Sequence, residues 1–138
     1  MVAERQATMA ASFLPSDAVP TIRMEYSGAP SPGSGITLWA RHEGGVLGAS
    51  ALGGRGVPAE RVGERAAKQL LELLASEAVV DEHAADQLVP ILGLHGGALR
   101  TSRVTAHARS NILVTEQFLP VRFRVDEKRG LIRAERLG

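Results

Sequence analysis

His107 is the residue whose type and position most directly suggest chemistry. It follows a stretch with β-strand character, residues 101–106, and precedes a helical pattern over residues 111–118. At such a junction, free backbone N–H groups and the positive end of the helix dipole attract phosphate and favour the neutral, nucleophilic imidazole. The position suits attack on a nucleotide phosphorus. A histidine that caps the helix or packs its ring also explains it, and position alone favours this second interpretation.

A second polar group lies on a predicted helix that begins after Asp81. On a helix, His83 faces Asp86 and Gln87, so one face gathers an imidazole, a carboxylate and a carboxamide. A carboxylate holds a metal ion or orients a donor, and a carboxamide recognises a base edge or a phosphate. A solvated polar face, with Asp86 serving local capping, accounts for the same residues.

Other motif searches exclude several kinds of chemistry. Residues 53–56 lack the Lys-Ser/Thr ending of a phosphate-binding P-loop, and His42 with Glu43 has no second histidine at metalloprotease spacing. The chain has no cysteine, which excludes disulfides, thiolate zinc sites and cysteine nucleophiles. After Pro120, a basic excess is typical either of an RNA contact or of a solvated hairpin face. Its members are Arg122, Arg124, Lys128, Arg129, Arg133 and Arg136, against Asp126, Glu127 and Glu135.

Composition sets broad limits on the class of protein. The net charge of +1 gives no strong global attraction to nucleic acid or to a membrane. No signal-peptide pattern is present, and no apolar run approaches the roughly 18–20 residues that span a bilayer. We therefore expect a cytoplasmic protein without a membrane partner.

The hydrophobic pattern predicts an α+β fold in two sets of elements. The first set is an antiparallel meander with two helices: strands over residues 22–26, 36–40 and 46–52, and helices over residues 2–13 and 58–76. The second set holds a helix capped by Asp81, which Pro90 kinks or ends, and the elements around His107. It closes with a hairpin that turns at Gly130. A domain boundary is expected near residue 77.

Taken together, the segments resemble the C-terminal part of the RNA 3′-terminal phosphate cyclases. The similarity is carried by residues 2–5, 31–33, 36, 38–40, 48–53, 60–64, 79–88, 107–112 and 116–123. These segments occur in the order expected for that family and cover essentially the whole chain.

The resemblance implies an ATP-dependent reaction of the ligase class. In that family a histidine takes AMP from ATP, forming a histidine–AMP intermediate and releasing pyrophosphate. AMP then passes to an RNA 3′-phosphate, and the neighbouring 2′-hydroxyl closes a 2′,3′-cyclic phosphate. His107 matches the nucleophile, and an ATP-contacting segment is matched by His83, Ala84, Ala85, Asp86 and Gln87. ATP and a divalent cation, expected to be Mg²⁺ with ligands unknown, are the implied cofactors, and RNA 3′-phosphate ends are the implied partner.

The chain departs from the family pattern in two ways. The motif reads His107, Ala108, Arg109, Ser110 and Asn111, where the family usually has two leucines and a threonine between histidine and asparagine. The family's members are also much longer. By resemblance, residues 1–76 are most of the small inserted α+β domain, lacking its first strand. Residues 77–138 are then the final part of a repeat-built α+β catalytic domain.

Three functional hypotheses follow from this resemblance. The chain is a cyclase fragment, inactive alone and active with a separate chain that carries the missing N-terminal portion. Alternatively, it resembles a non-catalytic branch of the family that works in RNA processing and ribosome assembly, which retention of His107 disfavours. The third hypothesis is a truncated, inactive reading frame.

Overall fold

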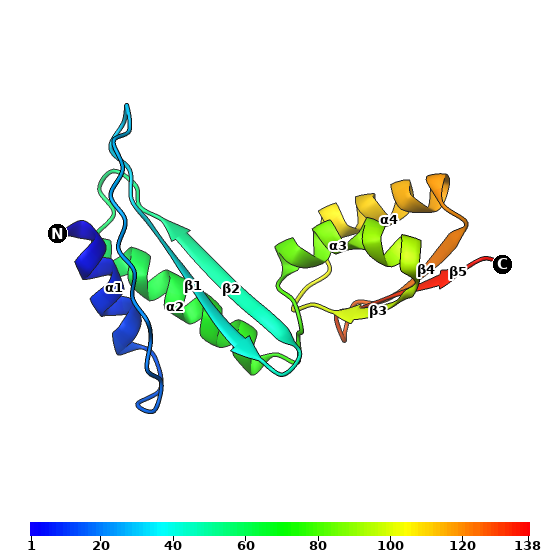
Figure 1. Cartoon of the computed structure of the whole chain (residues 1–138), viewed down its shortest axis with the longest axis horizontal. Coiled ribbons are helices and arrows are strands. Elements are labelled where there is room, and N and C mark those ends of the chain that lie inside the picture. The colour runs from blue at the N-terminus through cyan, green and yellow to red at the C-terminus, as the bar shows by residue number, and fades with distance from the viewer. The chain divides into compact units, whose positions relative to one another are not determined.

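The computed structural model describes residues 1–138 and confirms the α+β class (Figure 1). The chain forms two compact units. The N-terminal unit contains Met1–Ala40 and Gly48–Glu72, and the C-terminal unit contains Arg41–Leu47 and Leu73–Gly138. None of the helices combines the length and the apolar character that a bilayer-spanning segment requires. The assignment of residues 1–76 and 77–138 to an insert-like and a catalytic domain stays a prediction.

The N-terminal unit packs two helices on a hairpin. Its elements are α1 (Val2–Ser12) and most of β1 (Gly35–His42), β2 (Gly45–Leu52) and α2 (Ala59–Ala75). In β1, alternate residues are half-buried, as expected for a strand with one covered face. Ala51, Val62 and Ala66 are buried together, and Ile36 and Leu38 pack against them. The predicted helices and two of the predicted strands are therefore confirmed.

Helices α1 and α2 approach closely at Gly63. A Cβ atom at this position would overlap the carbonyl oxygen of Gln6, so the contact requires glycine. Gln6 itself is 1% exposed, and its side-chain amide donates to Ser34 Oγ over 3.1 Å. Nearby, the Arg5 guanidinium donates to both carboxylate oxygens of Glu60, at 2.6 and 2.9 Å. These contacts tie the first helix to the rest of the unit.

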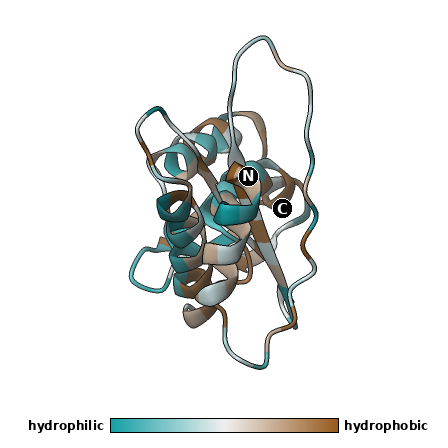
Figure 2. Cartoon of the chain, turned by 90° about the vertical axis from the view of Figure 1, so that its left-hand side faces the viewer, coloured by the Kyte–Doolittle hydropathy of each residue, from teal (hydrophilic) through white to brown (hydrophobic).

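The predicted strand over residues 22–26 is wrong. The chain between α1 and β1 has no regular secondary structure there, and Figure 2 shows it as a long loop. The side chains of Ile22, Met24 and Tyr26 are exposed. Alternating polarity favours a strand, but a strand forms only when a neighbour accepts its backbone hydrogen bonds. The two-stranded sheet of this unit contains only β1 and β2, so the predicted three-stranded meander is not formed.

The C-terminal unit packs two helices on a three-stranded antiparallel sheet. Its elements are α3 (Glu82–His95), β3 (Gly97–Arg100), α4 (Ala106–Phe118), β4 (Val121–Asp126) and β5 (Leu131–Arg136), with strand order β3-β5-β4. The core contains Val89, Ile112, Phe123 and Ile132. Pro90 was expected to kink the helix or to end it; α3 continues to His95, so the helix does not end there.

The predicted turn at Gly130 is confirmed and has a second role. Gly130 has φ of +61°, a backbone conformation that glycine adopts without strain. Its carbonyl oxygen accepts a hydrogen bond from the Thr101 amide over 2.9 Å. A Cβ atom at residue 130 would overlap the Thr101 carbonyl oxygen. The β4–β5 turn therefore packs directly on the segment that leads from β3 to α4.

The local structure around His107 differs from the prediction. The strand expected over residues 101–106 lies earlier, as β3, and α4 begins at Ala106 rather than at residue 111. His107 is thus inside the first turn of a helix. The segment 101–105 connects strand to helix through a bridge between Thr101 and Val80 and an irregular stretch.

Candidate functional site

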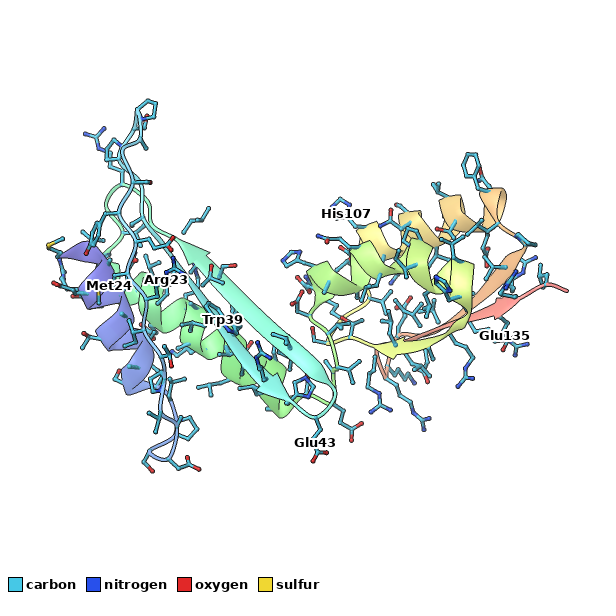
Figure 3. The ribbon with its side chains drawn as sticks, in the orientation of Figure 1. Arg23, Met24, Trp39, Glu43, His107 and Glu135 are labelled. Carbon is cyan, nitrogen blue, oxygen red and sulfur yellow. The ribbon has the colours of Figure 1, made fainter.

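The N-terminal turn of α4 places His107 at the surface. Thr105 is the N-cap residue, and its hydroxyl oxygen accepts a hydrogen bond from the Ala108 amide over 2.9 Å. His107 is the second residue of the helix, and its side chain is exposed and projects away from the sheet (Figure 3). Its imidazole makes no hydrogen bond within the chain. The ring is thus free to meet a ligand at the positive end of a helix.

Asp86 joins α3 to the cap of α4. The Thr105 hydroxyl donates to Asp86 Oδ1 over 2.5 Å while it accepts from Ala108. The Asn111 side chain donates to the backbone oxygen of Asp86 over 2.8 Å. Both contacts are partly buried. Asp86 thus contacts both the cap residue and the first turns of the helix that carries His107, and its predicted role in nucleotide binding stays a prediction.

The other residues of the predicted nucleotide segment divide into free and packed ones. His83 and Gln87 are exposed on α3 and make no side-chain hydrogen bond, so both are available to a ligand. Ala85 is fully buried and Ala84 half-buried, so their contribution is limited to backbone atoms and packing. The predicted N-cap is confirmed, because Asp81 Oδ1 accepts from the His83 and Ala84 amides at 3.0 and 2.9 Å.

Arg103 holds the connecting segment against the start of α3. Its guanidinium donates to both carboxylate oxygens of Glu82, at 2.8 and 2.9 Å. These hydrogen bonds, followed by the negative charge of Glu82, raise the pKa of Arg103 above its usual value. Arg103, Thr105 and Asn111 were missed from the sequence as site residues. A threonine immediately before a helical apolar pattern is a capping signal, and Thr105 precedes Ala108 and Ile112 in this way.

Arg109, the unexpected residue in the motif, points to the β4–β5 turn. Its guanidinium lies 2.8 Å from Glu127 Oε1, and both side chains are more than half exposed. The substitution therefore places an ion pair at the surface beside His107. It leaves the buried neighbours Ala108 and Ile112 in place.

The residues of the chain do not form a metal site. No three of its histidine, aspartate and glutamate side chains are arranged to hold an ion, and Asp86 is already engaged by Thr105. The free donors near His107 are an imidazole and a carboxamide, which suit phosphate or base contacts better than Mg²⁺. The donor set of this chain therefore does not fit a resident divalent cation.

Half of the six basic residues after Pro120 form ion pairs, namely Arg122, Arg124 and Arg129. Arg122 lies 3.6 Å from Glu116, and Arg124 lies 3.3 Å from Glu135. Arg124 is also directly opposite Arg133 across the β4–β5 pair. Most of this stretch is thus the solvated face of a hairpin.

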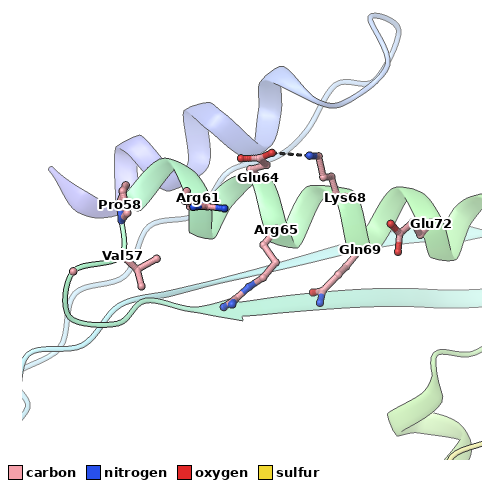
Figure 4. Close-up of a pocket in the computed structure, with 9 residues that line it drawn as sticks. Val57, Pro58, Arg61, Glu64, Arg65, Lys68, Gln69 and Glu72 are labelled. Atoms are coloured by element: carbon pink, nitrogen blue, oxygen red, sulfur yellow. Dashed lines mark hydrogen bonds and ion pairs between the residues drawn. The ribbon is translucent and has the colours of Figure 1, made fainter.

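A separate surface pocket of about 530 Å³ lies along α2 and contains none of the predicted site residues (Figure 4). Within it, Lys68 Nζ pairs with Glu64 over 2.6 Å, and the Arg65 guanidinium donates to the Leu52 carbonyl oxygen over 3.0 Å. The hydrogen bond from Lys68 lowers the pKa of Glu64. The pocket is the polar face of an amphipathic helix and presents no convergent set of free polar groups.

The fold and the site define the class of protein. It is an α+β protein with an exposed histidine in the first turn of a capped helix. Residues 1–75 match the family model of the RNA 3′-terminal phosphate cyclase (RTC) insert domain. The chain belongs to the RNA 3′-terminal phosphate cyclase family.

Three curated relatives support this assignment, and each is called RNA 3′-terminal phosphate cyclase. The Methanosarcina acetivorans protein is 55% identical over 102 residues, which are 73% of this chain and 28% of the relative. The Methanosarcina mazei protein is 48% identical over 132 residues, or 94% and 36%. The Pyrococcus abyssi protein is 46% identical over 130 residues, or 94% and 38%. The chain thus spans about a third of the length of these relatives.

Proposed function

We propose that this chain carries the nucleophile of an ATP-dependent RNA 3′-phosphate cyclase, and that His107 is the side chain that accepts AMP from ATP. The observation that carries this proposal is the unpaired, exposed imidazole in the first turn of α4, whose orientation depends on Thr105 and Asp86. The name of the relatives supplies the substrate class, an RNA 3′-terminal phosphate.

The proposed reaction has three balanced steps. A neutral ring nitrogen of His107 attacks the α-phosphorus of ATP, a P–N bond forms, and the bond to pyrophosphate breaks with its electron pair. An oxygen of the RNA 3′-phosphate then displaces the imidazole from the same phosphorus. Finally the 2′-hydroxyl loses its proton and attacks the activated 3′-phosphorus, so that a 2′,3′-cyclic phosphate forms and AMP leaves.

In the first step, the fold positions His107 and supplies the electrostatic field of the helix N-terminus. The helix dipole at the start of α4 stabilises negative charge on a phosphate bound there. His83 and Gln87 are free to bind the nucleotide, and Asp86 acts as a positioning residue through Thr105. The divalent cation that the family resemblance implies, Mg²⁺, would bind together with the nucleotide, because this chain has no group of carboxylates or histidines arranged to hold one.

One nucleophile and part of a nucleotide site do not position a triphosphate alone, so we expect turnover only with a polypeptide that supplies the remaining two thirds of a cyclase. The test is incubation of the two polypeptides with ATP labelled at the α-phosphate. Label on the wild-type chain and none on His107→Ala supports the proposal. His95→Ala is the matched control, because His95 is also exposed in the same unit.

Other outcomes favour the other hypotheses. Label that persists in His107→Ala contradicts the nucleophile assignment. A wild-type chain that binds its partner without taking label favours a non-catalytic role in RNA processing. A chain that neither binds nor takes label favours an inactive reading frame.

A further inference from the structure

The C-terminal unit contains a pocket of about 490 Å³ with a basic lining. Three short segments line this basic pocket: residues 76–78, residues 100–102 at the end of β3, and residues 128–130 of the β4–β5 turn. All three segments belong to the same compact unit. Neither His107 nor Arg109 lines the pocket, so it is distinct from the candidate nucleotide site.

Backbone hydrogen bonds hold the three walls of the basic pocket together. The Val79 amide donates to the Arg100 carbonyl oxygen over 2.9 Å, which fixes residues 76–78 beside the end of β3. The Thr101 amide donates to the Gly130 carbonyl oxygen over 2.9 Å, which fixes the turn. A pocket whose walls are already connected loses little conformational freedom when a ligand binds.

The charge of the basic pocket is positive and largely uncompensated. Its cations are Arg100, Lys128 and Arg129, and its single acid is Glu77. Lys128 forms no ion pair, and Arg129 Nε lies 3.9 Å from Asp126 Oδ2. Arg100 pairs with Glu77, but the Glu77 side chain is 85% exposed, so solvent weakens this pair. Three cations against one carboxylate leave a local charge of +2, whereas the whole chain carries +1.

The lining suits a phosphate group better than a base. The exposed Ser102 side chain makes no hydrogen bond within the chain, so its hydroxyl is available as a donor. Arginine and lysine bind phosphate oxygens through charge-assisted hydrogen bonds. No aromatic side chain lines the pocket, so it offers no surface on which a base would stack. A ligand in the pocket is therefore recognised by its phosphate.

The basic pocket lies close to the start of α4. Ser102 precedes His107 by five residues, and that length of chain spans at most about 18 Å. The turn that supplies Lys128 also supplies Glu127, whose carboxylate lies 2.8 Å from the Arg109 guanidinium. The turn therefore contacts both the pocket and the helix that carries His107.

We propose that the basic pocket binds a backbone phosphate of the RNA substrate, upstream of the 3′-phosphate that reaches His107. Lys128, Arg129 and the Ser102 hydroxyl bind that phosphate, and Arg100 adds to the positive potential. The strand is thereby held with its 3′ end near the nucleophile. The identity of the ligand as RNA rests on the proposed function, whereas the preference for a phosphate rests on the pocket alone.

The test is binding of the 138-residue chain to a fluorescent single-stranded RNA of about eight nucleotides, measured by anisotropy without ATP at several salt concentrations. The test variant combines Lys128→Gln with Arg129→Gln. The matched control, Arg122→Gln with Arg136→Gln, removes the same charge at the far end of the hairpin. We expect the test variant to bind at least about 10-fold more weakly at about 50 mM salt. Its slope of log affinity against log salt should fall by about 1.4, or about 0.7 for each cation. The control should bind nearly as tightly as the wild type.

Several outcomes would overturn the RNA site. Equal binding by the test variant and the control does so, and so does a wild-type chain that binds no RNA. An RNA that ends in a 3′-hydroxyl should depend on Lys128 and Arg129 to the same extent. Dependence seen only with a 3′-phosphate would mean that the terminal phosphate occupies the pocket. Labelled ATP that needs these two residues, when RNA does not, would make the pocket a nucleotide site.

The RNA site and the proposed chemistry fail in different ways. Loss of RNA binding in the test variant, without AMP label on His107 in the presence of the rest of a cyclase, supports the pocket and contradicts the proposed function. Label on His107 with unchanged RNA binding does the reverse. Equal midpoints of urea unfolding for the test variant and the control show that both are folded.

Discussion

Two segments that the sequence predicts as strands, residues 101–106 and residues 22–26, differ from each other in the structure. Around His107, the chain becomes a capped helix from Ala106 onward, because Thr105, Asp86 and Asn111 satisfy the first turn within the chain. Between α1 and β1, residues 22–26 remain irregular because no neighbour pairs with their backbone. Helix starts are satisfied by local side chains, whereas strands depend on partners that lie elsewhere.

The largest expected effect concerns the turn that supports the His107 region. Gly130→Ala should lower the free energy of unfolding by about 3 kcal/mol, because the Cβ atom would overlap Thr101 and φ is positive. Gly56→Ala is the matched control: its φ is +78° and no atom lies within 4 Å, so only backbone strain of about 1 kcal/mol is expected. Equal losses in urea unfolding would contradict the packing role of the turn.

The next effect isolates the link between α3 and α4. Thr105→Val removes the cap and leaves the partly buried Asp86 carboxylate without its donor, so we expect a loss of about 2 kcal/mol. Asp81→Ala removes a cap alone and should cost about 1 kcal/mol. Urea unfolding of both variants tests this expectation. If the loss in free energy of unfolding for Thr105→Val is no larger than for Asp81→Ala, Asp86 does not position α4.

The sequence predicted most elements that depend on local signals and missed those that depend on distant partners. The apolar spacing of α1 and α2 and the glycine turn of β4–β5 are local signals, and all were confirmed. The start of α4 was missed because residues 101–106 were interpreted as a strand, although the local capping residue Thr105 marks where the helix begins. Exposure of His107 agrees with the ligand-binding interpretation, but its role as a nucleophile is not visible in any contact and stays a proposal.

A smaller effect concerns the ion pair between α1 and α2. The hydrogen bond from Arg5 lowers the pKa of Glu60 below its usual value. A carboxylate with a lowered folded pKa stabilises the fold above its unfolded pKa of about 4.3, and this contribution is lost as the pH falls through the folded value. Glu60→Gln should therefore be less stable than the wild type at neutral pH. Thermal unfolding as a function of pH should show that difference closing in acid; a constant difference would contradict the assignment.

The smallest effect is expected in the unpaired segment. Ile22→Ser should change the free energy of unfolding of the isolated chain by less than about 0.5 kcal/mol, since the side chain packs on nothing that completes a core. Leu38→Ser on β1, which packs against Ala51 and Val62, should cost at least about 1 kcal/mol. A large loss for Ile22→Ser would show that the segment already stabilises the free unit.

The most direct measurement of the central claim is the position of the AMP adduct. Trypsin cleaves after Arg103 and Arg109, and the resulting peptide, residues 104–109, contains His107 as its single histidine. The chain is incubated with ATP and with the polypeptide that supplies the rest of a cyclase. Mass spectrometry at neutral pH should then find AMP on this peptide. AMP on the peptide over residues 69–100, which contains His83 and His95, or on neither peptide, would contradict the account.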